Sequence, residues 1–140
     1  MTHRPSRQHG YTLMELLITV SIITIVTSIA LPSYQNHVMR SHRTDAMGAL
    51  LRVANAQEKF YLQNNSYTGD LAELNITGTE SGYYDLTIAD ADVNGFTATA
   101  TASSGGPQEN DSKCQNFTID ATGALGAGSS GVDNTTECWR

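Results

Sequence analysis

An apolar stretch close to the N-terminus constrains this chain more than any other part of its sequence. Residues 11–31 contain one charged side chain, Glu15, and otherwise only apolar side chains and small hydroxyl-bearing ones. As an α-helix these 21 residues would be roughly 31 Å long, which is about the thickness of the hydrocarbon core of a bilayer. The sequence therefore predicts a membrane-spanning helix that carries one carboxylate inside its apolar stretch.

The polar leader before this helix, residues 1–10, predicts an unusual cleavage site. A secretory signal places its apolar stretch before the cleavage site, whereas here the basic leader comes first and ends at Gly10. Cleavage after Gly10 would leave the apolar helix on the mature protein, and the alternative is an uncleaved single-pass anchor. The basic leader favours a cytoplasmic N-terminus, although Arg40 and Arg43 beyond the helix favour the opposite orientation.

The predicted helix continues past the membrane segment into residues 35–63, where apolar side chains recur every three to four positions. The members of this stripe are Ala46, Met47, Leu50, Val53, Ala54, Gln57, Phe60 and Tyr61. Pro32 removes a backbone donor and predicts a kink before the stripe begins. Asn64 and Asn65 are expected to end the helix.

Between residues 82 and 121 the hydrophobic period changes to two, which indicates half-buried strands. The alternating segments are YYDLTI at 83–88, FTATATA at 96–102 and FTIDA at 117–121. The pair Asn94-Gly95 is typical of a hairpin turn. The predicted fold class is α+β, with one long N-terminal helix packed on an antiparallel sheet of three to four strands.

The two cysteines of the chain, Cys114 and Cys138, are predicted to form a disulfide if the domain lies outside the cytoplasm. The segment between them is rich in glycine and serine and has too few apolar side chains to order itself by burial. Residues 114–138 are therefore expected to form a disulfide-bonded loop. In the loop-entropy model, closing 25 residues contributes about 3 kcal/mol to stability.

The charge of the chain argues against nucleic acid as a partner. From Asp45 to Arg140 there are four basic and thirteen acidic residues, a net charge of −9. An acidic domain repels phosphate backbones unless a local basic patch intervenes. The sequence also shows no convincing nucleophile–base pair and no phosphate-binding loop, so neither an enzyme nor a cofactor is expected.

The segment DADVNG resembles the beginning of a calcium-binding loop, with Asp90, Asp92 and Asn94 at its first, third and fifth positions. A complete loop also needs a glutamate at its twelfth position, where this chain has Thr101. A hairpin turn is the favoured interpretation, and a weak calcium site is the alternative.

The sequence GYTLMELLI, from Gly10 to Ile18, resembles the class III signal of type IV pilins and related pseudopilins. That motif is a glycine, an aromatic residue and then a glutamate at the fifth mature position, although the family more often has phenylalanine where this chain has Tyr11. Pro32 also matches a proline of such pilins. The QEKFYLQNNSYT segment and the CQNFTID…CWR ending resemble PilE-like minor pilins and their ComP-like relatives.

The resemblance implies a type IV pilin fold with a leader at 1–10, a transmembrane and assembly helix at 11–34 and a periplasmic domain at 35–140. It further implies that a prepilin peptidase cleaves after Gly10 and methylates the amine of Tyr11. Glu15 of an incoming subunit would then pair with the N-terminal amine of a neighbour. Five small hydroxyl side chains offer contacts for such helix packing: Thr12, Thr19, Ser21, Thr24 and Ser28.

The function implied by the resemblance is a minor subunit of a type IV pilus, acting in pilus biogenesis, twitching motility and adhesion. Its expected partners are other pilin subunits, the prepilin peptidase and the inner-membrane assembly machinery. It is expected first in the inner membrane, with a periplasmic C-terminal domain, and then in the extracellular pilus. Two alternatives are a DNA-receptor minor pilin for natural transformation and a type II secretion pseudopilin, which the calcium-like segment would favour.

Overall fold

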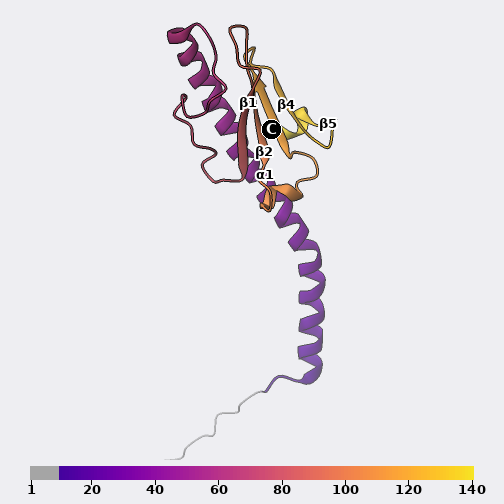
Figure 1. Cartoon of the computed structure of the whole chain (residues 1–140). Helices are drawn as coiled ribbons and strands as arrows, with labels where there is room; N and C mark the ends of the chain where they lie inside the picture. Colours follow the sequence, from indigo (N-terminus) through magenta and orange to yellow (C-terminus); the bar gives the residue numbers. More distant parts are fainter. Residues whose placement is uncertain (1–9) are drawn as a thin grey trace, which may run out of the picture. The chain divides into compact units, whose positions relative to one another are not determined.

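The computed structural model describes residues 10–140, which form one long helix followed by a small sheet domain (Figure 1). Helix α1 is 52 residues long and has the bounds Leu13–Asn64. Within the described residues, the chain divides into two compact units whose boundary falls between His37 and Val38. The first unit contains the apolar half of α1, and the second contains the rest of α1 and all of the sheet.

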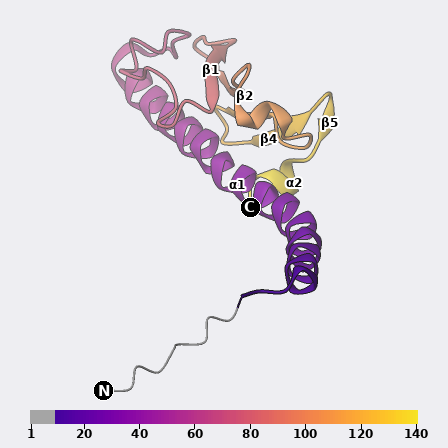
Figure 2. The same ribbon diagram turned by 90° about the horizontal axis from the view of Figure 1, so that it is seen from below.

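In the second unit α1 buries one face against the sheet (Figure 2). The buried residues of this face are Arg43, Ala46, Ala49, Leu50, Val53 and Gln57, which confirms the predicted stripe and adds a charged residue to it. Gln57 is buried because its amide exchanges two hydrogen bonds with the backbone of Thr68. The helix ends at Asn64, and Asn65 follows in the left-handed region at φ +52°, as the paired asparagines predicted.

The sheet is antiparallel, and its neighbours follow chain order. Its strands are β1 (Tyr84–Ala89), β2 (Thr97–Ala102), β3 (Asn116–Asp120), β4 (Leu125–Ser129) and β5 (Val132–Asp133). Tyr84, Ala98, Ala100, Phe117 and Ile119 point inward and form the core with α1. A short 3₁₀ helix, η1 (Pro107–Asn110), precedes β3, and a one-turn helix, α2 (Thr135–Cys138), follows β5. The α+β fold class and the three predicted strands are confirmed.

The sheet of the described residues has five strands rather than three to four, because the glycine-rich segment adds β4 and β5. Two glycines make this pairing possible. A Cβ on Gly126 would overlap the hydroxyl oxygen of Thr118, and a Cβ on Gly128 would overlap the carbonyl oxygen of Val132. The composition that predicted a loop therefore permits close strand approach instead.

The predicted β1–β2 hairpin is present, but its turn is longer than a two-residue Asn-Gly turn. The carboxylate of Asp92 accepts the backbone N–H of Asn94 at 2.6 Å and that of Gly95 at 3.1 Å. Asp90, and neither Asn94 nor Gly95, has a positive φ, at +52°. An aspartate side chain thus organises this turn in place of the left-handed backbone that the dipeptide predicted.

Candidate functional sites: the N-terminal helix and the disulfide region

The predicted cleavage site lies in non-helical backbone immediately before α1. Gly10 and Tyr11 precede the first helical residue, Leu13, and Tyr11 is 85% exposed. A Cβ built on Gly10 would meet no atom within 4 Å. A peptidase could reach the bond between Gly10 and Tyr11 without unwinding the helix. Any selection for glycine at this position would therefore come from the peptidase and not from the fold of this chain.

Glu15 lies in the first turn of α1, where Thr12 caps the helix. The hydroxyl oxygen of Thr12 accepts the backbone N–H of Glu15 at 3.2 Å. Sequence reasoning missed this cap, although a threonine three residues before a glutamate is its usual signature. The positive end of the helix dipole favours a carboxylate at this position. No ion pair of the Glu15 side chain occurs within residues 10–140, so its pairing with a cation stays a prediction.

The small hydroxyl residues of the apolar segment donate to their own helix backbone. Their distances to the carbonyl oxygens three or four residues earlier are 2.6 to 2.9 Å for Thr19, Ser21, Thr24, Thr27 and Ser28. These donors are therefore satisfied in a bilayer without a neighbouring helix. Contacts between helices would use the small size of these side chains or their remaining lone pairs, and the predicted packing role stays a prediction.

The first half of α1 is apolar and uncovered. None of its most apolar stretch is buried within the described chain. By length and composition, α1 could cross a membrane. Pro32 lies inside the helix, where it removes the N–H that would otherwise reach the carbonyl of Ser28.

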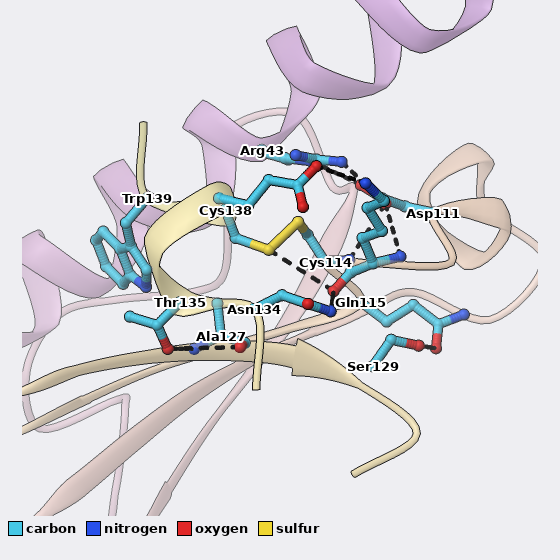
Figure 3. Close-up of a disulfide and its surroundings, with 12 residues drawn as sticks. Arg43, Asp111, Cys114, Gln115, Ala127, Ser129, Asn134, Thr135, Cys138 and Trp139 are labelled. Carbon is cyan, nitrogen blue, oxygen red and sulfur yellow. Dashed lines mark hydrogen bonds and ion pairs between the residues drawn. A yellow bond between two sulfur atoms is a disulfide. The ribbon is translucent and has the colours of Figure 1, made fainter. Parts of the chain in front are cut away.

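The second candidate site is the disulfide region of the domain, which Figure 3 shows in detail. Cys114 and Cys138 form the predicted disulfide, with 5.8 Å between their Cα atoms, and both residues are fully buried. The segment that it closes is also held by hydrogen bonds. The side-chain amide of Asn134 donates to the carbonyl of Lys113 at 3.0 Å, and the hydroxyl of Thr135 accepts the N–H of Ala127 at 2.8 Å.

Trp139 packs beside the disulfide segment against the sheet. Its indole N–H donates to the carbonyl of Gly126 at 2.9 Å. Its ring meets that of Phe117 edge to face, with 5.8 Å between centroids. Trp139 therefore packs against β3 and β4. Because this is the one tryptophan of the chain, its fluorescence reports the folding of this region.

A buried ion pair between Arg43 and Asp111 links α1 to the loop before Cys114. The guanidinium Nε and Nη2 donate to the two carboxylate oxygens at 2.7 and 3.0 Å (Figure 3). The side chains are only 10% and 4% exposed. The same carboxylate accepts the backbone N–H groups of Lys113 and Cys114, both at 3.2 Å. Sequence reasoning missed this pair, whose members lie 68 positions apart.

Tyr84 and Gln108 form a second buried polar contact below α1. The side-chain amide of Gln108 donates to the phenol oxygen of Tyr84 at 2.7 Å and to the carbonyl of Met39 at 3.2 Å. Burial raises the pKa of Tyr84 to about 12, although the hydrogen bond from Gln108 opposes this shift. The phenol therefore stays neutral throughout the physiological range, and the contact is structural.

The calcium-like residues Asp90, Asp92 and Asn94 lie together in the β1–β2 turn. Besides the backbone N–H groups of the turn, the Asp92 carboxylate accepts the side-chain amide of Asn94 at 3.1 Å. These hydrogen bonds lower the pKa of Asp92, the N–H of Asn94 being the largest cause. Among the residues that the structure describes, no cluster of three His, Cys, Asp or Glu side chains could hold a metal ion. The carboxylate shapes the turn.

We expect loss of the disulfide to destabilise the domain strongly. Cys138→Ser removes the constraint on a 24-residue separation and puts a hydroxyl in a fully buried position. The free energy of unfolding should fall by about 2–5 kcal/mol. Denaturant titration followed by Trp139 fluorescence measures this change, and Ser130→Ala, on the turn between β4 and β5, is the control. A loss below about 1 kcal/mol would show that the hydrogen bonds alone hold the segment.

Comparisons with known proteins agree with both halves of this architecture. Residues 32–118 match the sequence model of the family described as "Type IV minor pilin ComP, DNA uptake sequence receptor". Residues 5–31 match the prokaryotic N-terminal methylation motif. The chain is 36% identical over 101 residues to the fimbrial protein EcpC of Eikenella corrodens, which covers 71% of this chain and 65% of that protein. It is 33% identical over 98 residues to the pilus component PilA4 of Thermus thermophilus, covering 69% of this chain and 75% of the relative.

Solved pilin structures share the fold. The non-core minor pilin PilV of Neisseria meningitidis superposes with a TM-score of 0.54 at 23% identity, over 69% of this chain and 92% of that structure. A type IV pilin of Shewanella oneidensis gives a TM-score of 0.51 at 24% identity, over 73% of this chain and 98% of that one. Pilins are structural subunits and not enzymes. The chain therefore belongs to the type IV pilins and, through residues 32–118, to the family of the minor pilin ComP.

Proposed function

We propose that this chain is a minor structural subunit of a type IV pilus, anchored in the inner membrane before it joins the fibre. The observation that carries this proposal is the contrast between the two units. The domain from Val38 onward has a buried hydrophobic core, whereas the most apolar stretch of α1 is not buried at all within the described residues. Lipid would cover this half before assembly, and the helices of other pilins would cover it afterwards.

The proposed path begins at the membrane with residues 11–34 inserted and the domain 35–140 in the periplasm. A prepilin peptidase cleaves between Gly10 and Tyr11, and methylation of Tyr11 follows. The inner-membrane assembly machinery then lifts the subunit into the fibre, where Glu15 pairs with the amine of a neighbouring subunit. Roles in pilus biogenesis, twitching motility and adhesion would follow from this incorporation.

The direct test of this function is to locate and count the subunit. Pili sheared from cells should contain it at a small, constant ratio to the major subunit, measured by quantitative mass spectrometry. A deletion strain should make fewer pili or show reduced twitching, and the plasmid-borne gene should restore both. Failure to find the subunit in pili, together with its accumulation in a secretion complex, would favour a pseudopilin.

We expect Gly10→Val to block processing. A Cβ at this position would meet no atom within 4 Å among the described residues, so the effect is expected on the peptidase rather than on the fold. Intact-mass analysis of the membrane fraction should find a mature chain beginning at methylated Tyr11 in the wild type and the full leader in the variant. Gly69→Val, an exposed glycine with equal space around it, is the matched control. An intact leader in the wild type, with the peptidase present, would contradict the proposal.

A second candidate function is DNA reception during natural transformation, because the matched family is described as a DNA uptake sequence receptor. The net charge of −9 from Asp45 to Arg140 opposes it, since phosphate contacts supply most non-specific DNA affinity. Gel-shift titration at rising salt separates the two candidates. Specific, salt-dependent binding of a short duplex, with transformation lost in a deletion strain that still makes pili, would favour the receptor.

A further inference from the structure

A basic groove lies on the domain at the point where α1 passes α2. We define it by its lining residues, Arg40, Arg43, Thr136, Glu137 and Arg140, which enclose about 440 Å³. All five belong to the second compact unit. The groove joins the first turns of the domain half of α1 to the last residues of the chain.

The cations of this groove differ in how they are neutralised. Arg43 forms an ion pair with the carboxylate of Asp111. The carboxylate of Glu137 forms an ion pair with Lys113, with 2.7 Å between Oε1 and Nζ. Within residues 10–140, Arg40 and Arg140 have no acidic side chain within 4 Å. Both are exposed. The groove therefore offers two exposed guanidinium groups outside any ion pair, beside a buried arginine–aspartate pair, although the carboxylate of Glu137 also lines it. Guanidinium groups bind phosphate oxygens through charge-assisted hydrogen bonds.

The groove is an isolated positive region on a negative domain. The groove residues and their ion-pair partners have a net charge of +2, because four of these side chains are basic and two are acidic. The basic ones are Arg40, Arg43, Lys113 and Arg140, and the acidic ones are Asp111 and Glu137. The rest of the domain has two basic and eleven acidic residues, a net charge of −9. A negatively charged surface would attract the groove and repel the remainder, and would thus orient the domain.

The chain itself keeps the groove close to such a surface. Arg40 follows Leu31, the end of the apolar stretch, by nine residues of α1, which is roughly 14 Å of helix. While the apolar half is in a bilayer, Arg40 therefore stays within roughly 14 Å of the end of the apolar stretch, which is about two Debye lengths at physiological salt. A DNA strand would instead need a row of cations, whereas this groove has two free ones surrounded by acidic surface.

We propose that the basic groove binds the phosphate of an anionic glycerophospholipid headgroup while α1 is inserted in the membrane. The inference rests on the membrane-anchored state of the proposed function. Binding orients the domain on the periplasmic leaflet and is released when the subunit leaves the bilayer for the fibre. Arg40 and Arg140 are the phosphate ligands, and Arg43 is a positioning residue at the floor of the groove.

The test uses the full mature chain in nanodiscs of phosphatidylcholine with increasing phosphatidylglycerol. The indole N–H resonance of Trp139, the neighbour of Arg140, reports occupancy. It should shift with phosphatidylglycerol and return toward its starting position as sodium chloride is raised. Arg40→Gln should raise the phosphatidylglycerol fraction at half-maximal shift about fivefold, and the double variant with Arg140→Gln should abolish the shift. Lys59→Gln removes an exposed cation from the same helix and should change nothing.

Each other outcome overturns the lipid assignment. A Trp139 resonance that does not move as phosphatidylglycerol is added, or a shift that persists in the double variant, shows that the groove does not bind the headgroup. A matching shift from soluble glycerol phosphate in phosphatidylcholine nanodiscs assigns the site to free phosphate. A shift with a DNA duplex but none with phosphatidylglycerol assigns it to DNA. Failure of the chain to co-elute with nanodiscs would instead refute the proposed membrane anchoring.

Discussion

Glu15→Leu should leave membrane insertion and cleavage intact while reducing incorporation into pili about tenfold or more. A carboxylate at mid-membrane costs roughly 2.5–3.5 kcal/mol on insertion scales. Glu15 lies in the first turn of α1, nearer the expected membrane surface. There the helix dipole stabilises the ionised carboxylate by about 0.3–1 kcal/mol. The dipole does not offset the whole cost, so leucine should insert at least as well as glutamate.

The remaining cost is the reason to expect a cation. Cleavage after Gly10 would create an amine at Tyr11, four residues before Glu15. Within a fibre, the amine of one subunit and the carboxylate of the next would meet in a low-dielectric bundle of helices. A hydrogen bond to a charged group is worth about 1.5–3 kcal/mol, which corresponds to tenfold or more in incorporation.

The measurement is quantitative immunoblotting of sheared pili against membranes, with the wild-type major subunit present. Glu58→Leu makes the same chemical change at an exposed position of α1 and should incorporate normally. Thr12→Ala removes only the helix cap and separates capping from pairing. Equal incorporation of Glu15→Leu and the wild type would refute an assembly role for the carboxylate. A defect of equal size in Thr12→Ala would assign the role to the cap.

Local patterns in the sequence predicted most of the backbone correctly. Two periodic patterns identified the buried faces of their segments: the 3.6-residue stripe through Leu50 and Val53, and the two-residue alternation around Phe117. The methylation-type motif at Gly10 is also local, and its family was identified from it. The roles of Gly10, Glu15 and Pro32 in processing and assembly stay predictions, because they concern molecules other than this chain.

Features that depend on distant residues were not predicted. The strands β4 and β5 lie in a segment whose glycine content predicted a loop. Their pairing depends on the absence of a Cβ at two of these glycines, which lets the backbone approach Thr118 and Val132 closely. The grouping of Arg40 and Arg140 across the fold likewise has no signature in the sequence. The net charge from Asp45 to Arg140 is a sum over the whole domain, so it left open whether a local basic patch exists.

The Arg43–Asp111 pair also changes the interpretation of the charges that follow the membrane segment. Arg43 opposed the predicted orientation when its charge was counted from the sequence. In the folded domain Asp111 neutralises it, so Arg40 is the one uncompensated cation of that flank. Topology is decided before the domain folds, however, and the basic leader must then dominate for the N-terminus to remain cytoplasmic.

Asp111→Ala should be among the most destabilising single substitutions in the domain, lowering the free energy of unfolding by about 3–5 kcal/mol. It leaves the guanidinium of Arg43 buried without a counter-ion, and it also removes the acceptor of the N–H groups of Lys113 and Cys114. Those two residues lead directly into the disulfide. The substitution therefore loosens α1 and the disulfide region together.

A double-mutant cycle isolates the ion pair from these other losses. Arg43→Met keeps the apolar stem of the side chain and removes the charge, so combining it with Asp111→Ala should cost clearly less than the sum of the two single changes. Lys113→Gln breaks the exposed pair with Glu137, whose side chains are 56% and 44% exposed, and should cost at most about 1 kcal/mol. Denaturant unfolding of the mature chain in detergent, followed by Trp139 fluorescence, measures all four variants. Additive losses would mean that the two charges do not stabilise each other, and that Asp111 acts only as an acceptor for the loop.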